Sequence, residues 1–219
     1  MIDHLLELYQ DVIDEFVLVL SSEFDAVVRR HCSAYENLAQ RVGYVIQHHP
    51  SGMLPAILLA TSMVEYHRPK SVWITWCDQV GIRPATIQRL LQLTADHPRA
   101  DLIFPTALKK YPYIHFDRDS HGKVNGVRQQ REGDPMPEVG EGDSGLFALS
   151  LDAYLGHLPA FASATQNGAE TGERNFIPFI PWIAKHGTVV TYPVQDVMES
   201  IGVNTTADAQ SIEEYLARR

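Results

Sequence analysis

VWITWCDQVGI, residues 72–82, joins an apolar run to an acidic residue and then to the start of a helical pattern. The run 72–77 is typical of a strand buried in a sheet, and the segment from Pro84 to about Asp96 has the spacing of a helix. Asp78 follows the predicted strand directly. Open α/β sheets bind their ligands at the carboxyl ends of their strands. The stretch therefore predicts one strand–helix unit with Asp78 at the ligand-binding edge.

The same alternation of short apolar runs with helical spacing continues along most of the chain. We expect strands at residues 14–22, 42–47, 72–77, 101–106, 144–150 and 188–194. We expect helices at residues 2–12, 24–39, 53–67, 84–96, 151–158, 174–186 and 207–218. Alternation of this kind is typical of βαβ units. The prediction is a single domain over residues 1–219, with a Rossmann-like, three-layer α/β/α fold around a mostly parallel mixed sheet.

The middle of the chain departs from this pattern. The turn SHGK, residues 120–123, separates two short runs that resemble an antiparallel hairpin. We therefore expect an antiparallel insertion near residues 112–150. Within it, REGDPMPEVGEGD (131–143) is rich in glycine, proline and acids, which favours a loop at the rim of an active site.

Composition limits the partners and the setting of the protein. The 219 residues carry a net charge of −9, whereas proteins that bind nucleic acid normally present a basic face, so we expect no nucleic-acid partner. The longest apolar segment, residues 54–64, is too short to span a bilayer, so we expect no membrane association. Cys32 and Cys77 lie far apart without metal-binding spacing, which favours a reduced, cytoplasmic setting.

A second motif, ESIGVNT at residues 199–205, contains the partner that Asp78 needs for a metal site. Mg²⁺ prefers oxygen ligands and usually takes one or two protein groups together with water and substrate phosphates. The carboxylate of Asp78 and the amide oxygen of Asn204 fit that preference. Both residues could instead cap helices or lie in loops.

Five motifs, in order, carry a resemblance over essentially the whole chain. They are QHHPSGM (47–53), WCDQ (76–79), DSGLF (143–147), TGERNF (171–176) and GVNT (202–205). Together they resemble the MobA-like NTP transferase (sugar-phosphate nucleotidyltransferase) superfamily, and most closely the N-acetylglucosamine-1-phosphate uridylyltransferases. The resemblance implies Mg²⁺-dependent transfer of a nucleotidyl group from an NTP to a phosphorylated acceptor, with a sugar 1-phosphate as the expected acceptor and pyrophosphate as the product.

The resemblance also implies roles for the catalytic and nucleotide-binding residues. Asp78 and Asn204 would hold Mg²⁺ as the catalytic pair, and Asp78 would meet the nucleotide phosphates through it. Gln47 and Gly52 would contact the base, because a glutamine amide both donates and accepts hydrogen bonds. Gln47 could also be a surface amide. The segment that follows, residues 51–56, differs from the family's LGTGHA, so the base stays open.

On the acceptor side the resemblance assigns Asp143, Gly145 and Glu173. Asp143 stands where the family has an asparagine, and a carboxylate can only accept hydrogen bonds from a sugar hydroxyl. Gln129 stands about where a further acid is usual, so the sequence does not specify an N-acetylhexosamine. All of these residues could instead be ordinary polar loop residues.

One element of the family pattern has no counterpart in this chain. Family members open with a strand and a glycine-rich loop of the form LAAGxGTRM…PK, whereas residues 1–6, MIDHLL, resemble the segment just after that loop. We therefore expect the first, central strand to be missing from the sheet. Two hypotheses follow: a nucleotidyltransferase whose loop is supplied upstream, or a truncated, inactive homologue that serves as a nucleotide-binding or regulatory subunit.

Overall fold

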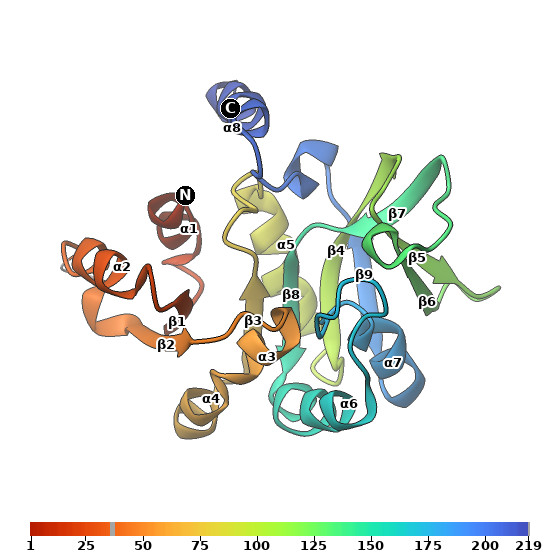
Figure 1. The fold of residues 1–219 in the computed structure, drawn as a ribbon, viewed down its shortest axis with the longest axis horizontal. Coiled ribbons are helices and arrows are strands. Elements are labelled where there is room, and N and C mark those ends of the chain that lie inside the picture. Colours follow the sequence, from red (N-terminus) through yellow and green to blue (C-terminus); the bar gives the residue numbers. More distant parts are fainter. Residues whose placement is uncertain (36–37, 219) are drawn as a thin grey trace.

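The computed structural model describes residues 1–35 and 38–218. Helices and strands alternate along the chain as the apolar pattern predicts (Figure 1). The strands are β1 (Phe16–Ser21), β2 (Val42–Gln47), β3 (Ser71–Thr75), β4 (Leu102–Lys110), β5 (Ile114–Arg118), β6 (Val124–Gln129), β7 (Val139–Asp143), β8 (Leu146–Ser150) and β9 (Val189–Pro193). The helices are α1 (Ile2–Tyr9), α2 (Asp25–Cys32), α3 (Met53–Leu58), α4 (Thr61–His67), α5 (Pro84–Asp96), α6 (Leu158–Ala164), α7 (Phe179–His186) and α8 (Thr206–Ala217).

Strand β4 organises the central five-stranded sheet. It pairs in parallel with β9 and antiparallel with β7 and β8, and β8 in turn pairs antiparallel with β3. Strands β3, β4 and β9 therefore run in one direction. Strands β7 and β8 run in the opposite direction, and β5 and β6 form a separate hairpin. All four lie within the predicted insertion, residues 112–150. The prediction of a mixed α/β fold with an antiparallel insertion is confirmed.

Strands β1 and β2 form a parallel pair of their own, and in the described residues no ladder joins this pair to the five-stranded sheet. Figure 1 shows the pair to one side of β3. Helix α1 connects the two sheets. Its buried Tyr9 packs in one cluster with Phe16 of β1 and Trp73 of β3, and the Tyr9 hydroxyl donates a hydrogen bond to Thr75 (3.5 Å). Helix α1 therefore bridges the break between the two sheets.

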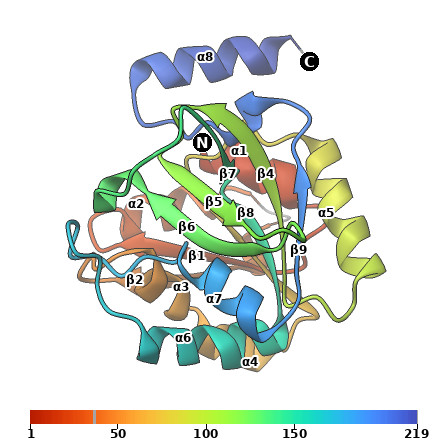
Figure 2. The same cartoon turned by 90° about the vertical axis from the view of Figure 1, so that its right-hand side faces the viewer.

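The central sheet buries both of its faces, which makes three layers. Side chains alternate along β4, so that Phe104 packs with α6 and α7 while Ile103 packs with α5 and α1. Strand β8 alternates in the same way, with Phe147 on the first face and Leu146 on the second. Figure 2 shows α6 and α7 together on one side of the molecule and α8 lying apart across its end. No helix in the described chain is long and apolar enough to cross a membrane.

The helices predicted over 2–12, 24–39 and 53–67 are interrupted or shorter in the structure, and the first of them ends at Tyr9. The helix expected over 53–67 breaks into α3 and α4, and at the break the Thr61 hydroxyl donates to the Leu58 carbonyl (2.6 Å), a local hydrogen bond that competes with the helical pattern. The helix expected over 24–39 ends at Cys32, and positions 36–37 of that prediction lie outside the described residues.

Two other boundaries differ for reasons of local chemistry. The helix expected over 174–186 begins only at Phe179, because Pro178 disfavours helical backbone in the residue before it. The predicted loop 131–143 contains strand β7, which pairs with β4 despite its Gly-rich, acidic sequence. Gly140 permits the close packing there, since a Cβ atom would lie 2.8 Å from the His115 ring. Tertiary packing therefore overrides the composition of this segment.

Candidate functional site

Asp78 lies in the turn three residues after β3, beside the loop that leads into α8. The Val203 amide donates a hydrogen bond to the Asp78 carbonyl (3.0 Å). Gly202 lies against the Asp78 carboxylate, so closely that a Cβ atom on Gly202 would be 2.5 Å from Oδ2. The two segments that carry the predicted metal pair are therefore in direct contact, and only glycine leaves room for the carboxylate at position 202.

Asn204 is exposed and lies at the start of α8. Its side-chain amide donates to the Gly202 carbonyl (3.2 Å), and its backbone amide donates to Asp208 (3.1 Å). The helix cap is Thr205, which forms a capping box with Asp208, so the capping role open to Asn204 is taken by its neighbour. In the described hydrogen bonds the Asn204 side-chain oxygen accepts none. That oxygen is therefore available to a ligand.

The buried amide of Gln79 links the Asp78 loop to the acceptor-side motif. In the orientation that satisfies both neighbours, it donates to the Ser144 carbonyl and accepts from the Gly202 amide, each at 3.3 Å. The motif is held further by the Gly145 amide, which donates to Asp143 Oδ1 (2.8 Å). Sequence reasoning assigned no role to Gln79. Gln79 is a polar residue between Asp78 and the apolar Val80, which is no distinctive signal.

Burial shifts the ionisation of the groups around Asp78. It raises the pKa of the Asp78 and Asp143 carboxyls above their usual range. It lowers the pKa of the Lys109 ammonium, although the nearby Asp143 charge works against that shift. Burial, followed by the charges of Asp143 and Asp78, raises the pKa of Tyr113 to about 12. Two acids in surroundings this poor in water favour a bound cation.

The residues present fit a magnesium ion. Asp78 and Asn204 offer carboxylate and amide oxygens, the donor types that Mg²⁺ prefers. Among the described residues no cationic side chain lies within 4.0 Å of Asp78, so no ion pair there neutralises this half-buried carboxylate. No group of three His, Cys, Asp or Glu side chains able to hold a metal ion occurs among the described residues. A metal here would take few protein ligands, as Mg²⁺ at a nucleotide usually does.

The predicted base-binding residues form a second group. The Gln47 amide donates to the Gly52 carbonyl (3.2 Å). Gly52 has φ +112° and lies against the backbone of Arg174, where a Cβ atom would be 2.5 Å from the carbonyl oxygen. Glu173, which is predicted to bind the acceptor substrate, directly precedes Arg174 and forms an ion pair with Arg131 (3.7 Å). The structure thus joins Gln47 and Gly52 to the loop that carries Glu173.

Trp76 connects the two groups. Its backbone amide donates to the Gly145 carbonyl (3.1 Å), and its ring lies 5.9 Å from that of Phe176, two residues after Arg174. The structure shows no direct contact between Asp78 and Gln47. The candidate site therefore consists of a metal-side group and a base-side group that share an aromatic wall.

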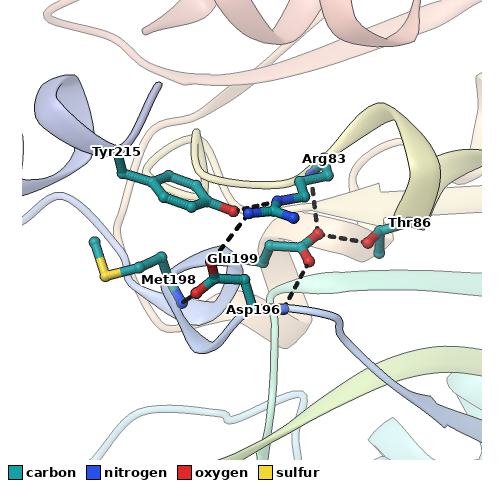
Figure 3. A network of polar contacts seen from close by, with 6 residues as sticks. All are labelled: Arg83, Thr86, Asp196, Met198, Glu199 and Tyr215. Carbon is teal, nitrogen blue, oxygen red and sulfur yellow. Dashed lines mark hydrogen bonds and ion pairs between the residues drawn. The ribbon is translucent and has the colours of Figure 1, made fainter. Parts of the chain in front are cut away.

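Glu199 anchors the loop that precedes Gly202 (Figure 3). Its carboxylate is fully buried and accepts hydrogen bonds from the Arg83 amide (2.9 Å), the Thr86 hydroxyl (2.5 Å) and the Asp196 amide (3.3 Å). The Arg83 guanidinium in turn bonds Asp196 (3.0 Å) and the Tyr215 hydroxyl (2.6 Å). The network ties the start of α5 to α8. It fixes the two metal-side segments against each other.

Gly145 supplies a test of the packing at the site. It has φ +69°, and a Cβ atom would lie 2.4 Å from Gln79 and 2.6 Å from Trp76. Gly145→Ala is expected to lower the free energy of unfolding by about 2–5 kcal/mol, since it combines backbone strain with overpacking. Gly122, with φ +77° and open space around it, is the matched control. Gly122→Ala should cost only about 1–2 kcal/mol. Urea unfolding measures both, and equal losses would contradict close packing at Gly145.

Comparison with known protein families matches residues 1–141 to the MobA-like NTP transferase domain. Among curated proteins, none matches the sequence. Solved structures of nucleotidyltransferases share the fold. A putative glucose-1-phosphate thymidylyltransferase from Bacillus anthracis, in complex with a sucrose, aligns with TM-score 0.75 at 12% identity and covers 99% of this chain and 82% of that chain.

Two further structures align over almost the whole chain. CMP:2-keto-3-deoxy-manno-octonic acid synthetase complexed with CTP gives TM-score 0.67 at 14% identity, covering 99% of this chain and 87% of that chain. HddC from Yersinia pseudotuberculosis complexed with GMP-PN gives TM-score 0.61 at 15% identity, covering 98% and 83%. At such identities the likeness concerns the fold alone. The family match, however, covers more than half of the sequence, and the chain belongs to the MobA-like NTP transferase domain family.

Proposed function

We propose that this protein transfers a nucleotidyl group from an NTP to a phosphorylated acceptor, with a sugar 1-phosphate as the expected acceptor. The observation that carries the proposal is the half-buried, uncompensated carboxylate of Asp78, packed against Gly202 in a chain of this family. The solved structures of similar fold are in keeping with it, since two of them hold the nucleotides CTP and GMP-PN.

Asp78 and Asn204 would hold Mg²⁺, which when bound neutralises negative charge on the phosphates. The amide of Gln47 and the backbone at Gly52 would orient the base. An oxygen of the acceptor phosphate attacks the α-phosphorus in line, and the bond between that phosphorus and the pyrophosphate oxygen breaks. The protein contributes positioning and electrostatic stabilisation and forms no covalent bond in this step.

Asp143, Gly145 and Glu173 would bind the acceptor. Glu173 is partly exposed and forms an ion pair with Arg131, so one acidic and one basic side chain lie together in this part of the site. Asp143 is buried and fixes the backbone at Gly145 through its hydrogen bond to that amide. Glu173 is accordingly the better candidate for a hydrogen bond to a sugar hydroxyl, and Asp143 for shaping the loop beneath it.

The test is pyrophosphate release from each of the four common NTPs, with and without a panel of sugar 1-phosphates. We expect one NTP–acceptor pair to give turnover with Mg²⁺, loss of that turnover on chelation with EDTA, and recovery when Mg²⁺ is restored in excess. Release that persists without divalent cation, or no release with any pair, would contradict the proposal.

A second candidate is a non-catalytic nucleotide-binding or regulatory subunit. The observation that favours it is that, in the described residues, no ladder joins the β1–β2 pair to the five-stranded sheet. This candidate predicts saturable NTP binding by calorimetry without any pyrophosphate release. The same panel therefore distinguishes the two candidates, because only the enzyme releases pyrophosphate.

A further inference from the structure

Lys109, near the carboxyl end of β4, extends its ammonium group toward the loop that precedes Gly202. The ammonium donates a hydrogen bond to the Ser200 carbonyl (3.1 Å) and lies 5.6 Å from the centre of the Tyr113 ring. A lysine ammonium has three protons to donate. Among the described hydrogen bonds Lys109 uses one, so two donors are available to a ligand.

Three arginines near the site already have a counter-charge. Each of them pairs with a carboxylate, namely Arg83 with Asp196 (3.0 Å), Arg118 with Glu141 (2.6 Å) and Arg131 with Glu173 (3.7 Å). Lys109, in contrast, forms no ion pair within 4.0 Å in the described part of the chain. No acidic side chain of the described residues therefore neutralises this partly buried cation at contact distance.

The negative charge that acts on Lys109 comes from a residue close to Asp78. The charge of Asp143 acts on the Lys109 ammonium, and the charge of Asp78 acts on Asp143. Lys109 pairs with Gly140 across the β4–β7 ladder, and a Cβ atom on Gly142 would lie 3.7 Å from Lys109 Cε, so the lysine stem runs close to β7. Burial disfavours the charged lysine, and a bound anion would offset that cost.

We propose that Lys109 binds a phosphate oxygen of the substrates. This inference rests on the proposed function and adds to it a specific cationic contact. The ligand chemistry is a phosphate group, which either the NTP or the sugar 1-phosphate could provide.

The test compares Lys109→Gln with Lys110→Gln. Lys110 is the next residue on β4, is exposed, and carries the same charge, so it controls for the change in net charge. Calorimetry measures the Kd of two separate probes, inorganic pyrophosphate with Mg²⁺ and glucose 1-phosphate. Lys109→Gln is expected to weaken at least one of them about 10- to 100-fold, the effect of losing one charge-assisted hydrogen bond, whereas Lys110→Gln should leave both within about 2-fold.

The outcomes show which substrate supplies the phosphate that Lys109 binds. They also distinguish failure of the Lys109 assignment from failure of the proposed function. Weakened pyrophosphate binding assigns Lys109 to the nucleotide side, and weakened glucose 1-phosphate binding assigns it to the acceptor side. Wild-type binding that Lys109→Gln leaves unchanged would overturn the assignment of Lys109 and leave the proposed function standing. Wild-type protein that binds neither the probes nor any NTP would overturn both.

Two further variants guard against a purely structural effect. Lys109→Arg keeps the charge and is expected to retain binding within about 3-fold of wild type. Lys109→Met keeps the aliphatic stem that packs between β4 and β7, and it provides the neutral variant if Lys109→Gln does not show a cooperative thermal transition. Loss of binding in Lys109→Arg equal to that in the neutral variants would indicate a packing role and contradict the proposal.

Discussion

With Mg²⁺, the Asp78→Asn variant is expected to release pyrophosphate about 10²- to 10³-fold more slowly than wild type, because it lacks the charged metal ligand. Without metal, the same variant is expected to be more stable than wild type at neutral pH. Burial raises the pKa of Asp78, so the ionised carboxylate destabilises the folded protein. Asparagine keeps the shape and removes the charge. Activity and stability should therefore change in opposite directions.

The pH dependence of that stability difference has a definite sign. Below the unfolded-state pKa of about 3.9 the carboxyl of Asp78 is protonated in both states, and the two proteins should have similar Tm values. As the pH rises through the higher folded-state pKa, wild type loses stability relative to Asp78→Asn. Thermal melts from about pH 3 to about pH 8 measure this. Added Mg²⁺ with nucleotide should raise the wild-type Tm and leave that of the variant unchanged.

Asp11→Asn is the control for this experiment, since Asp11 is exposed and lies in the turn after α1. It should leave turnover within about 2-fold and stability within about 0.5 kcal/mol of wild type. Full activity in Asp78→Asn would contradict the assignment of Asp78. A variant less stable than wild type throughout the pH range would contradict the account of its burial.

Glu199→Ala is expected to cause the largest loss of stability, about 3–5 kcal/mol, in the free energy of unfolding. The side chain is fully buried, and truncation leaves the Arg83 amide, the Thr86 hydroxyl and the Asp196 amide without their acceptor. Glu199→Gln keeps the shape and one oxygen, and should cost about 1–3 kcal/mol. Urea unfolding at pH 7 measures both losses.

Glu214→Ala on α8 is the matched control. Glu214 is largely exposed and pairs only with Arg218 at 3.4 Å in the described residues, so its loss should cost less than about 0.5 kcal/mol. The activity of Glu199→Gln should fall as well, because the network positions the Gly202 loop against Asp78. A cost for Glu199→Ala below about 1 kcal/mol would show that the network in Figure 3 does not anchor this loop.

The parts of the fold that the sequence predicts well are those with a local signal. The apolar runs of β2, β3 and β8 and the helix α5 carry their own periodicity, and Asp78 follows β3 as predicted. The role of Asp78 in binding a ligand stays a prediction. The sequence pairs Asp78 with the motif at residues 199–205, and the structure brings Gly202 of that motif against the Asp78 carboxylate. The roles of Asn204 and Gln47, and the extent of the domain over 1–219, stay predictions.

The parts that the sequence does not predict depend on contacts between distant segments. Gln79 acts through Ser144 and Gly202, and Lys109 acts through Ser200, so neither residue stands out within its own stretch. Strand β7 has the composition of a loop and becomes a strand by pairing with β4. Glu199 opens the motif at residues 199–205, but its hydrogen bonds to Arg83 and Thr86, more than 100 residues away, have no local signal.

Metal occupancy tests the central claim most directly. Electron paramagnetic resonance of Mn²⁺, used in place of Mg²⁺ with the NTP that gives turnover, or with each NTP in turn, reports the number of ions bound per chain. We predict one nucleotide-dependent ion in wild type and in Asp11→Asn, weaker binding in Asn204→Ala, and none in Asp78→Asn. Equal Mn²⁺ binding by wild type and Asp78→Asn would contradict the account, because the metal would then be held elsewhere.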